Sequence, residues 1–498
     1  MRTGPGCSFG GARRCVMSKS GMLWGGRFRH PPAPEMMRLS RADASFFRLT
    51  PYDIDACQAH ARELERAGLL ATAEREAICS ALTGIAQDHR EGRALPIETD
   101  EDVHTFVERL LTERLGALGG KLRAGRSRND QAANDLKLFL RDGARLLAQD
   151  VIGLQEALVA QAKLHIETVA PGFTHLQPAQ PVSYAHQLLA HAQTLWRDVE
   201  RLRDWDRRAA TSPLGAAAMA GSAIALRSDL SAAELGYDAP CENSIDAVGS
   251  RDHVAEFVFV AAMTNVHLSR LAEELFLWSS RQFGWIELHD SYATGSSIMP
   301  QKKNADIAEL TRGRAARLIG DLATVLTMLK GLPFAYNRDL SEDKRAAFDA
   351  LDSLLATLPA LAGMVASMTV RVDRLLAQST DGFTLATEVA DWLSRRGVPF
   401  AHAHEITGAL VQACEEKGVG LQDLTAEELA AFDPRLDATL LQALTAQAAI
   451  AARSGPGGTA PARVREQLAR LEARLVEQRA WAGAYAGPRH FPDRDKPA

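Results

Sequence analysis

The chain has 498 residues, of which 46% are hydrophobic and 24% charged, a composition typical of a soluble globular protein with a large buried core. Its 57 Lys and Arg residues nearly balance its 62 Asp and Glu residues, and the net charge of -5 argues against bulk electrostatic binding to nucleic acid or acidic membranes. Any anionic ligand must therefore be held by cations placed locally around it.

Targeting and membrane signals are weak in this sequence. Residues 1–22 contain basic residues and no acidic one, and we interpret them as a Gly-rich, disordered leader rather than a transit peptide. The apolar stretch 353–370 is too short and too polar for a membrane span, so we expect a buried bundle helix there. The six cysteines show no zinc-type spacing, which indicates reduced thiols and a cytoplasmic protein.

Helical periodicity dominates the rest of the chain. Residues 54–92 are expected to form two helices joined at Gly68, and residues 131–169 a single helix about 58 Å long that stops before Pro171. Helices of this length bury their apolar stripes best side by side. Strand-like alternation is scarce, so the predicted fold is all-α, with further long helices over 183–210, 250–283, 305–330 and 342–370.

This pattern predicts three helical domains behind the leader. An N-terminal helical domain covers 23–126, a central bundle of long helices covers 127–376, and a C-terminal helical domain covers 377–498. The last dozen residues are expected to form a frayed polar tail. Polar segments rich in residue types that hold carboxylates and move protons interrupt the bundle at 124–130, 171–181, 243–252 and 288–304.

The most informative of these segments is 295–304, which reads Gly-Ser-Ser-Ile-Met-Pro-Gln-Lys-Lys-Asn. A Gly-Ser-Ser tripeptide alone would be an ordinary linker, but the ten-residue string closely resembles the third signature of the aspartase/fumarase superfamily in its argininosuccinate lyase form. Segments 174–180 and 250–256 resemble the first and second signatures. Segments 23–28 (Leu-Trp-Gly-Gly-Arg-Phe) and 125–131 (Gly-Arg-Ser-Arg-Asn-Asp-Gln) are similar to strings specific to argininosuccinate lyases.

The resemblance extends from Leu23 to about Thr459 and implies the reversible β-elimination of argininosuccinate to arginine and fumarate, a step of arginine biosynthesis. It also implies an aspartase/fumarase-like fold and a homotetramer whose active sites draw segments from three subunits. Neither a cofactor nor a metal is expected, because the sequence has no Gly-rich nucleotide loop and because His402 and His404 do not share a helix face. The implied ligand is argininosuccinate, with no nucleic acid or membrane partner.

Eliminating an amine from a succinyl group requires an enzyme to bind two carboxylates, remove a proton beside one of them, spread the new charge and protonate the leaving nitrogen. The side chains suited to holding carboxylates are those of Arg126, Ser127, Asn129, Thr174, Lys302 and Asn304. The resemblance adds Tyr336 and Lys344 as substrate-binding residues. Segment 126–130 also suits the start of the long helix, with Asn129 or Asp130 as its cap.

The resemblance assigns the proton transfers as well. Ser296, on a mobile loop, faces the carbon proton, Lys302 stabilises the doubly charged intermediate, and His175 is the paired proton-transfer group, oriented by Glu309. Accounts of the family differ on which group is the base. We favour Ser296 as base and His175 as acid, because the leaving guanidino nitrogen suits an imidazolium donor. We interpret His104 as a structural residue that forms hydrogen bonds below the site.

Three positions depart from the family pattern. Ala42 stands where a substrate-contacting Ser is usual, unless the register shifts to Ser40 or Ser45; Ser341 replaces a Gln near the amino-acid end of the substrate; and Ala305 replaces a Pro. The residues that handle the succinyl group are all present, so the reaction type is better supported than the substrate. The alternatives are a carbon–nitrogen lyase of another N-substituted aspartate, such as an aminopolycarboxylate, and a non-catalytic crystallin-like protein.

Overall fold

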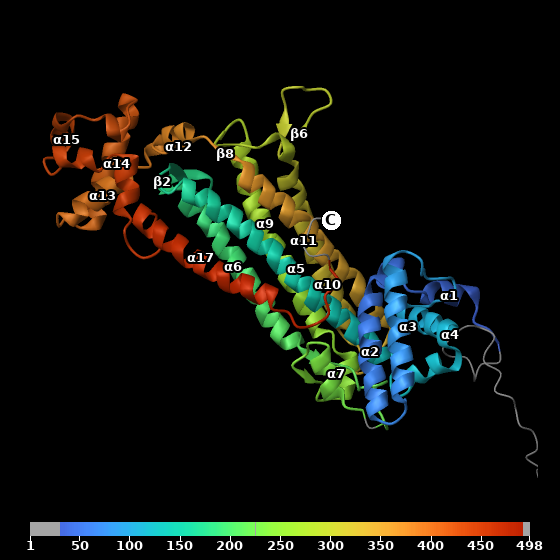
Figure 1. Ribbon diagram of the computed structural model, residues 1–498. Coiled ribbons are helices and arrows are strands. Elements are labelled where there is room, and N and C mark those ends of the chain that lie inside the picture. Colours follow the sequence, from blue (N-terminus) through green and yellow to red (C-terminus); the bar gives the residue numbers. More distant parts are fainter. Residues whose placement is uncertain (1–29, 225, 492–498) are drawn as a thin grey trace, which may run out of the picture.

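The computed structural model describes residues 30–224 and 226–491, so the predicted leader at 1–22 and the 23–28 segment lie outside the described residues. Long helices packed side by side dominate the molecule (Figure 1), and the predicted all-α fold is confirmed. The central bundle is built from α5 (Arg128–Leu164), α6 (Tyr184–Ala209), α9 (Asp252–Ser279), α10 (Asp306–Leu329) and α11 (Asp343–Ser367).

A group of shorter helices packs on the start of α5 at one end of the bundle (Figure 1). These helices are α1 (Pro34–Ser40), α2 (Thr50–Arg66), α3 (Thr72–Arg90) and α4 (Val103–Leu115). α2 and α3 are the predicted pair, and Gly68 between them has φ +75°, a left-handed conformation that glycine adopts at helix ends. Their apolar residues join those of the bundle in one continuous hydrophobic core, which fixes them to α5.

The helices after α11 divide into two groups. A separate hydrophobic core, with members from Leu385 to Ala449, holds the first group together. That group consists of α13 (Ala386–Arg395), α14 (Phe400–Lys417), α15 (Ala426–Phe432) and α16 (Ala446–Ala452), and it follows α12 (Val372–Gln378). The final helix, α17 (Pro461–Gly483), packs instead along α5 and α6. A domain boundary at 377 stays a prediction, but the last helix packs with the bundle.

The frayed tail predicted for the last dozen residues is wrong for 487–491. The backbone N–H of His490 donates to Asp142 Oδ2 at 2.7 Å, and its imidazole pairs with Asp55 at 2.5 Å. The ring of Phe491 packs into the main core. The prediction failed because the segment is polar overall, whereas the rings of His490 and Phe491 attach it to α2 and α5.

The helix predicted over 131–169 ends earlier than expected, at Leu164, because the next segment forms a β-hairpin. β1 (Val169–Thr174) pairs antiparallel with β2 (Gln177–Ser183). Prolines at 171, 178 and 181 lack the amide hydrogen that a helix needs, so the segment cannot prolong α5. The other described strands are two-residue pairs: β3 (Thr211–Ser212) with β4 (Ala239–Pro240), β5 (Ile286–Glu287) with β8 (Thr369–Val370), and β6 (Thr294–Gly295) with β7 (Lys303–Asn304).

One helical stretch, 338–367, is long and apolar enough to cross a membrane by length and composition. Most of it is α11, which lies within the bundle in contact with α5, α9 and α10. Leu354, Leu358 and Leu361 are fully buried there. The buried bundle helix predicted over 353–370 accounts for this apolar stretch.

A buried ion cluster holds α5 against α6. Asp206 on α6 accepts a hydrogen bond from Arg141 Nε at 2.8 Å and pairs with Arg145, and both arginines lie on α5. All three side chains are buried. Removing the shared carboxylate charge would leave two guanidinium groups in a poorly solvated place without their counter-charge.

We therefore expect Asp206→Asn to lower the free energy of unfolding by about 3 kcal/mol, as measured by urea denaturation. Asp204→Asn, on the same helix, removes only an exposed pair with Arg207 and should cost less than about 1 kcal/mol. Equal losses in the two variants would contradict the role assigned to Asp206.

Candidate active site

Three of the predicted substrate-binding residues lie in or just before the first turn of α5: Arg126, Ser127 and Asn129. Ser127, rather than Asn129 or Asp130, is the N-cap: its hydroxyl accepts from the backbone N–H of Asn129 at 3.3 Å, and its own N–H donates to Asp130 Oδ1 at 3.0 Å. The Asn129 side chain donates to the carbonyl of Ala218 at 3.0 Å. The segment therefore both starts the helix and fixes the side chains that follow.

Arg126, just before this cap, faces a cavity of about 260 Å³. One of its nitrogens, Nη2, lies 3.2 Å from the Cys57 sulfur, whereas Nε and Nη1 are buried and have no hydrogen-bond partner among the described residues. Ser127 and Asn129 line the same cavity. A buried guanidinium with two free donors is suited to a carboxylate, which can accept both hydrogen bonds.

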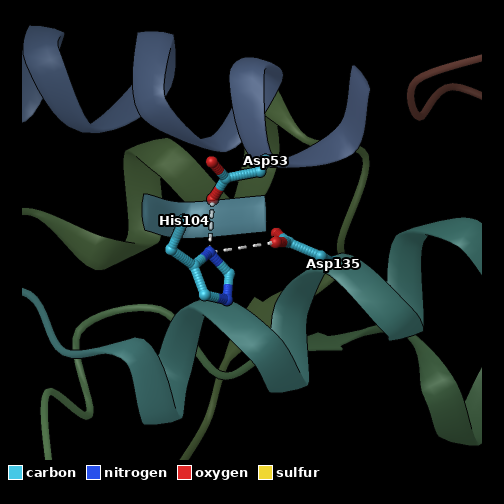
Figure 2. A group of neighbouring side chains, drawn as sticks. All are labelled: Asp53, His104 and Asp135. Atoms are coloured by element: carbon cyan, nitrogen blue, oxygen red, sulfur yellow. Dashed lines mark hydrogen bonds and ion pairs between the residues drawn. The ribbon is translucent and has the colours of Figure 1, made fainter. Parts of the chain in front are cut away.

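Behind this cavity, His104 lies between two buried carboxylates (Figure 2). Its Nδ1 is 3.0 Å from Asp53 Oδ1 and 3.7 Å from Asp135 Oδ2. Burial alone would lower the pKa of His104, but the charges of Asp53, Asp102 and Asp135 outweigh it and raise the pKa to about 9. Burial and the charge of Asp53 together raise the pKa of Asp135. These charges favour the protonated imidazolium form of His104, whose Nδ1–H donates to Asp53 while Asp135 lies nearby without a hydrogen bond to the ring.

The same three residues bring their ligand atoms within 4.8 Å of one another, a spacing that suits a metal ion. The charges around them do not suit one. The guanidinium of Arg126 adds positive charge near Asp53, and the raised pKa of His104 means that its ring nitrogens carry protons rather than free lone pairs. We interpret the group as a hydrogen-bonded ion cluster that supports the cavity wall.

A second cavity of about 600 Å³ lies on the other side of His104, which lines both. The predicted residues Tyr336 and Lys344 line it, and so do Ala42 and Ser341, the two positions that depart from the family pattern. The ammonium group of Lys344 is 2.8 Å from Asp343, so a ligand carboxylate here would share it with that buried acid. The structure thus gathers residues from distant parts of the sequence around one space.

His175 occupies the tip of the β1–β2 hairpin, where it is exposed to solvent. It has φ +56° and the next residue, Leu176, has φ +57°, so two consecutive non-glycine residues adopt the left-handed conformation. Each such residue costs of the order of 1 kcal/mol, and functional sites are where that strain is most often retained. Thr174 immediately precedes the turn, so the side chains of Thr174 and His175 are both exposed at the tip of the hairpin.

Ser296 and Lys302 lie on an exposed loop closed by the β6–β7 pair. Ser296 Oγ accepts from the backbone N–H of Met299 at 3.1 Å and of Ile298 at 3.4 Å. Backbone donors that point at the hydroxyl oxygen favour its deprotonated form.

Two further predicted residues lie near this loop. The Asn304 amide is 3.5 Å from the hydroxyl of Thr294, across the β6–β7 pair. Glu309 is exposed in the first turn of α10. Among the described residues, no hydrogen bond joins Glu309 to His175, so their pairing stays a prediction.

One protomer therefore divides the predicted residues between the two ends of the bundle (Figure 1). One end holds Arg126, Ser127, Asn129, Tyr336 and Lys344; the other holds Thr174, His175, Ser296, Lys302, Asn304 and Glu309. α5 connects the two ends through 37 residues, which corresponds to about 55 Å. A small molecule cannot contact both groups of one chain.

Three residues at the wall between the cavities were not predicted from the sequence. Asp53 and Cys57 lie one turn apart on α2, and Asp135 lies one turn after Gln131 on α5. They could have been recognised as polar residues on helix faces that were expected to be buried, since buried polar groups need partners. In the structure, Gln131 donates to Asp53 at 3.1 Å, and Gln131 and Asp135 are both buried.

Comparison with known proteins identifies the family. A family described as "Lyase" matches residues 26–320, and one described as "Argininosuccinate lyase C-terminal" matches residues 383–451. "Argininosuccinate lyase 1" of Pseudomonas fluorescens is 63% identical over 93% of this chain and 98% of its own length, and "Argininosuccinate lyase 2" of Rhizobium meliloti is 59% identical over 95% and 96%. The chain belongs to the argininosuccinate lyase family.

Solved structures agree with this assignment. EDDS lyase in complex with formate shares 32% identity and a TM-score of 0.79, covering 90% of this chain and 91% of that one. A class II fumarase from Schistosoma mansoni, at 16% identity and a TM-score of 0.67 over 80% of this chain and 91% of that one, shows the same fold. As a member of the argininosuccinate lyase family, the protein is a carbon–nitrogen lyase with the predicted aspartase/fumarase-like architecture.

The ion cluster at His104 predicts a dependence of stability on pH. The pKa of His104 rises from 6.5 to about 9 on folding, so its stabilisation is complete below pH 6.5 and is lost as the pH rises through 9. We expect the difference in unfolding free energy between the wild-type protein and His104→Gln to shrink by about 3 kcal/mol across that range, measured by urea denaturation.

His402→Gln is the matched control, because His402 is exposed on α14. Its difference from the wild-type protein should not change over the same range. A pH-independent cost of His104→Gln would show that the imidazole is neutral in the folded protein.

Proposed function

We propose that the protein is an argininosuccinate lyase, which splits argininosuccinate reversibly into arginine and fumarate. The observation that carries the proposal is the match, at 63% identity and over nearly its whole length, to a relative named argininosuccinate lyase. The residues needed for the reaction are present, and the buried guanidinium of Arg126 has two donors free for a carboxylate.

In the proposed reaction, Ser296 removes the proton from the carbon beside a succinyl carboxylate. The electron pair left on that carbon spreads onto the carboxylate, where the Lys302 ammonium stabilises the second negative charge. The bond between carbon and the guanidino nitrogen then breaks, and His175 as imidazolium gives its proton to that nitrogen. One proton is taken and one returned, so fumarate and arginine leave in balance.

The remaining residues hold the substrate in this scheme. Thr174, Asn129 and Asn304 bind the succinyl carboxylates together with Arg126, and Tyr336 and Lys344 receive the arginine portion in the larger cavity. Ser127 keeps the first turn of α5 in place through its cap. Glu309 orients the His175 ring. The backbone donors to Ser296 Oγ assist its ionisation, and closure of its loop would exclude water.

Because the two groups of residues lie at opposite ends of one chain, we propose a homotetramer in which each site combines segments of several subunits. Apolar side chains support this assembly. Phe259 on α9 and Leu310, Ile319 and Leu326 on α10 are exposed, by 61% for Leu310, although α9 and α10 belong to the central bundle. Such a surface is typical of a subunit interface. We also propose a cytoplasmic location, in line with free thiols.

Fumarate release from argininosuccinate, followed by ultraviolet absorbance, tests the function directly. We expect turnover by the purified protein. Ala42 and Ser341, which line the larger cavity, and the likeness to EDDS lyase favour one second candidate, a lyase of another N-substituted aspartate such as an aminopolycarboxylate. Release of fumarate from such a compound but not from argininosuccinate would replace the first proposal with the second.

Mixing two inactive variants tests the shared site. Ser296→Ala and Asn129→Ala should each lower kcat about a thousandfold without unfolding the protein, since both side chains are near the surface. In randomly mixed tetramers, about a quarter of the sites receive both wild-type side chains from different subunits, so activity should return to about a quarter of the wild-type value. No recovery in verified mixed tetramers would contradict sharing.

A further inference from the structure

The second signature, segment 250–256, has no part in the proposed reaction, yet it borders a cavity of its own. This cavity, about 260 Å³, lies between α5, the end of α6 and the start of α9. Its lining includes Lys137, Arg208, Cys241, Asp246, Asp252, His253 and Glu256. Four helices, α5, α6, α8 (Ser244–Gly249) and α9, thus bring titratable side chains to one space outside the proposed active site.

The inner wall of this cavity is suited to a carboxylate. Lys137 points its ammonium group at the carbonyl of Thr211, 3.0 Å away, which leaves further donors. His253 lines the cavity and is only 8% exposed, and its buried Nε2 has no hydrogen-bond partner among the described residues. An unpaired buried nitrogen is costly, and a ligand oxygen would remove that cost.

The start of α9 adds to this environment. Arg251 is the N-cap residue of this helix, but its side chain makes no capping hydrogen bond and runs instead to Asp343, with Nε 2.6 Å from Oδ2. The positive end of the α9 dipole therefore has no side-chain cap, and Asp252 in the first turn offsets it only in part, from the exposed mouth of the cavity.

The mouth of the cavity carries the opposite charge. Asp246 on α8 and Asp252 on α9 are both exposed there. The remaining ions cancel each other, because Arg208 Nε lies 3.0 and 3.1 Å from the two carboxylate oxygens of Glu256. A ligand that reaches from the mouth to the inner wall thus meets two carboxylates first and an ammonium group last.

We propose that this cavity binds a free α-amino acid as a zwitterion, with its carboxylate at Lys137 and His253 and its ammonium group at Asp246 and Asp252. The cavity is separate from the larger cavity that Tyr336 and Lys344 line, since the two have no lining residue in common among the described residues. The proposal does not depend on the identity of the lyase substrate, and its test uses no turnover.

Isothermal titration calorimetry on the full-length protein, with glycine, acetate and methylammonium as probes, tests the site. We expect glycine to bind at one site per chain, and at least about tenfold more tightly than acetate or methylammonium, because only glycine carries both charges. Saturating fumarate should not displace glycine. No glycine binding at concentrations of about 20 mM, or complete displacement by fumarate, would overturn the proposal.

Variants assign the contacts. Lys137→Met should weaken glycine and acetate binding at least about tenfold, whereas Lys163→Met, an exposed lysine of the same helix, should change neither. Asp246→Asn, at the exposed mouth, should reduce glycine affinity towards that of acetate and leave acetate binding unchanged. Asp246→Asn keeps the test decisive even if Lys137→Met fails to fold. Unchanged glycine affinity in Asp246→Asn would contradict the zwitterion geometry.

The pH dependence of acetate binding gives a further readout. The pKa of Lys137 is lowered to about 8, first by burial and then by the positive charges of Arg251 and Arg141. Cys241 and Asp246 have weaker effects in the opposite direction. Among the other groups that line the cavity, Arg208 and Glu256 form an ion pair. The pKa of His253 is lowered by burial and by the positive charges of Lys137 and Arg251, so its imidazole is neutral.

Acetate itself does not titrate between pH 7 and 10, so its affinity should stay constant up to about pH 8 and fall about tenfold per pH unit above that. Lys137→Arg, which stays charged, should retain binding without this decrease. An affinity that is independent of pH in the wild-type protein would exclude Lys137 as the group that holds the carboxylate.

Discussion

The length of α5 is the constraint on which the rest of the molecule depends. Its 37 residues carry the turn predicted to bind carboxylates at one end and lead into the His175 hairpin at the other, about 55 Å away. The helix is rigid because α6, α11 and α17 pack along it, and because its buried arginines share Asp206 with α6. No movement within one protomer can bring its ends together, and this is why we propose a site built between chains.

Buried charge surrounds the two cavities in which we propose that the substrate binds. Arg126, His104, Asp53 and Asp135 are all removed from water, where isolated ions are strongly unfavourable. His104, Asp53 and Asp135 persist because each lies near an opposite charge or a donor, whereas the Arg126 guanidinium donates to the Cys57 sulfur and keeps Nε and Nη1 unused. Such a cluster is stable only while its geometry is fixed, which explains why α2, α4 and α5 share one continuous core around it. The same rigidity prepares Arg126 for a ligand anion before the ligand arrives.

Much of this arrangement could be predicted from the sequence, since helix periodicity reports a local preference. The long helices at 183–210, 250–283, 305–330 and 342–370 begin and end within a few residues of the predicted positions. The hairpin at 169–183 was missed, because its prolines remove the alternation by which strands are recognised. The packing of 487–491 on α2 and α5 was missed because it depends on two aromatic rings finding distant partners. Both errors concern contacts that only the folded chain makes.

The candidate site also contains residues that could be predicted from the sequence and residues that could not. Motifs located residues such as Asn129 and Ser296, because their neighbours in sequence form a recognisable string. Asp53 and Asp135 belong to no such string, and their proximity to His104 arises only when α2 and α5 pack together (Figure 2). Sequence therefore reports the residues that face the ligand more readily than those that hold them in place.

The turn at His175 and Leu176 connects local strain with assembly. A two-residue hairpin turn with positive φ at both positions favours Asn and Gly, whose backbones adopt it at little cost. Here the positions hold an imidazole and a leucine that is 68% exposed in the single chain. Neither the strain nor the exposed leucine stabilises an isolated protomer. Both features are explained if the hairpin tip is buried against another subunit. Leu176 would then gain a contact surface, and the left-handed backbone would direct the His175 imidazole away from its own bundle.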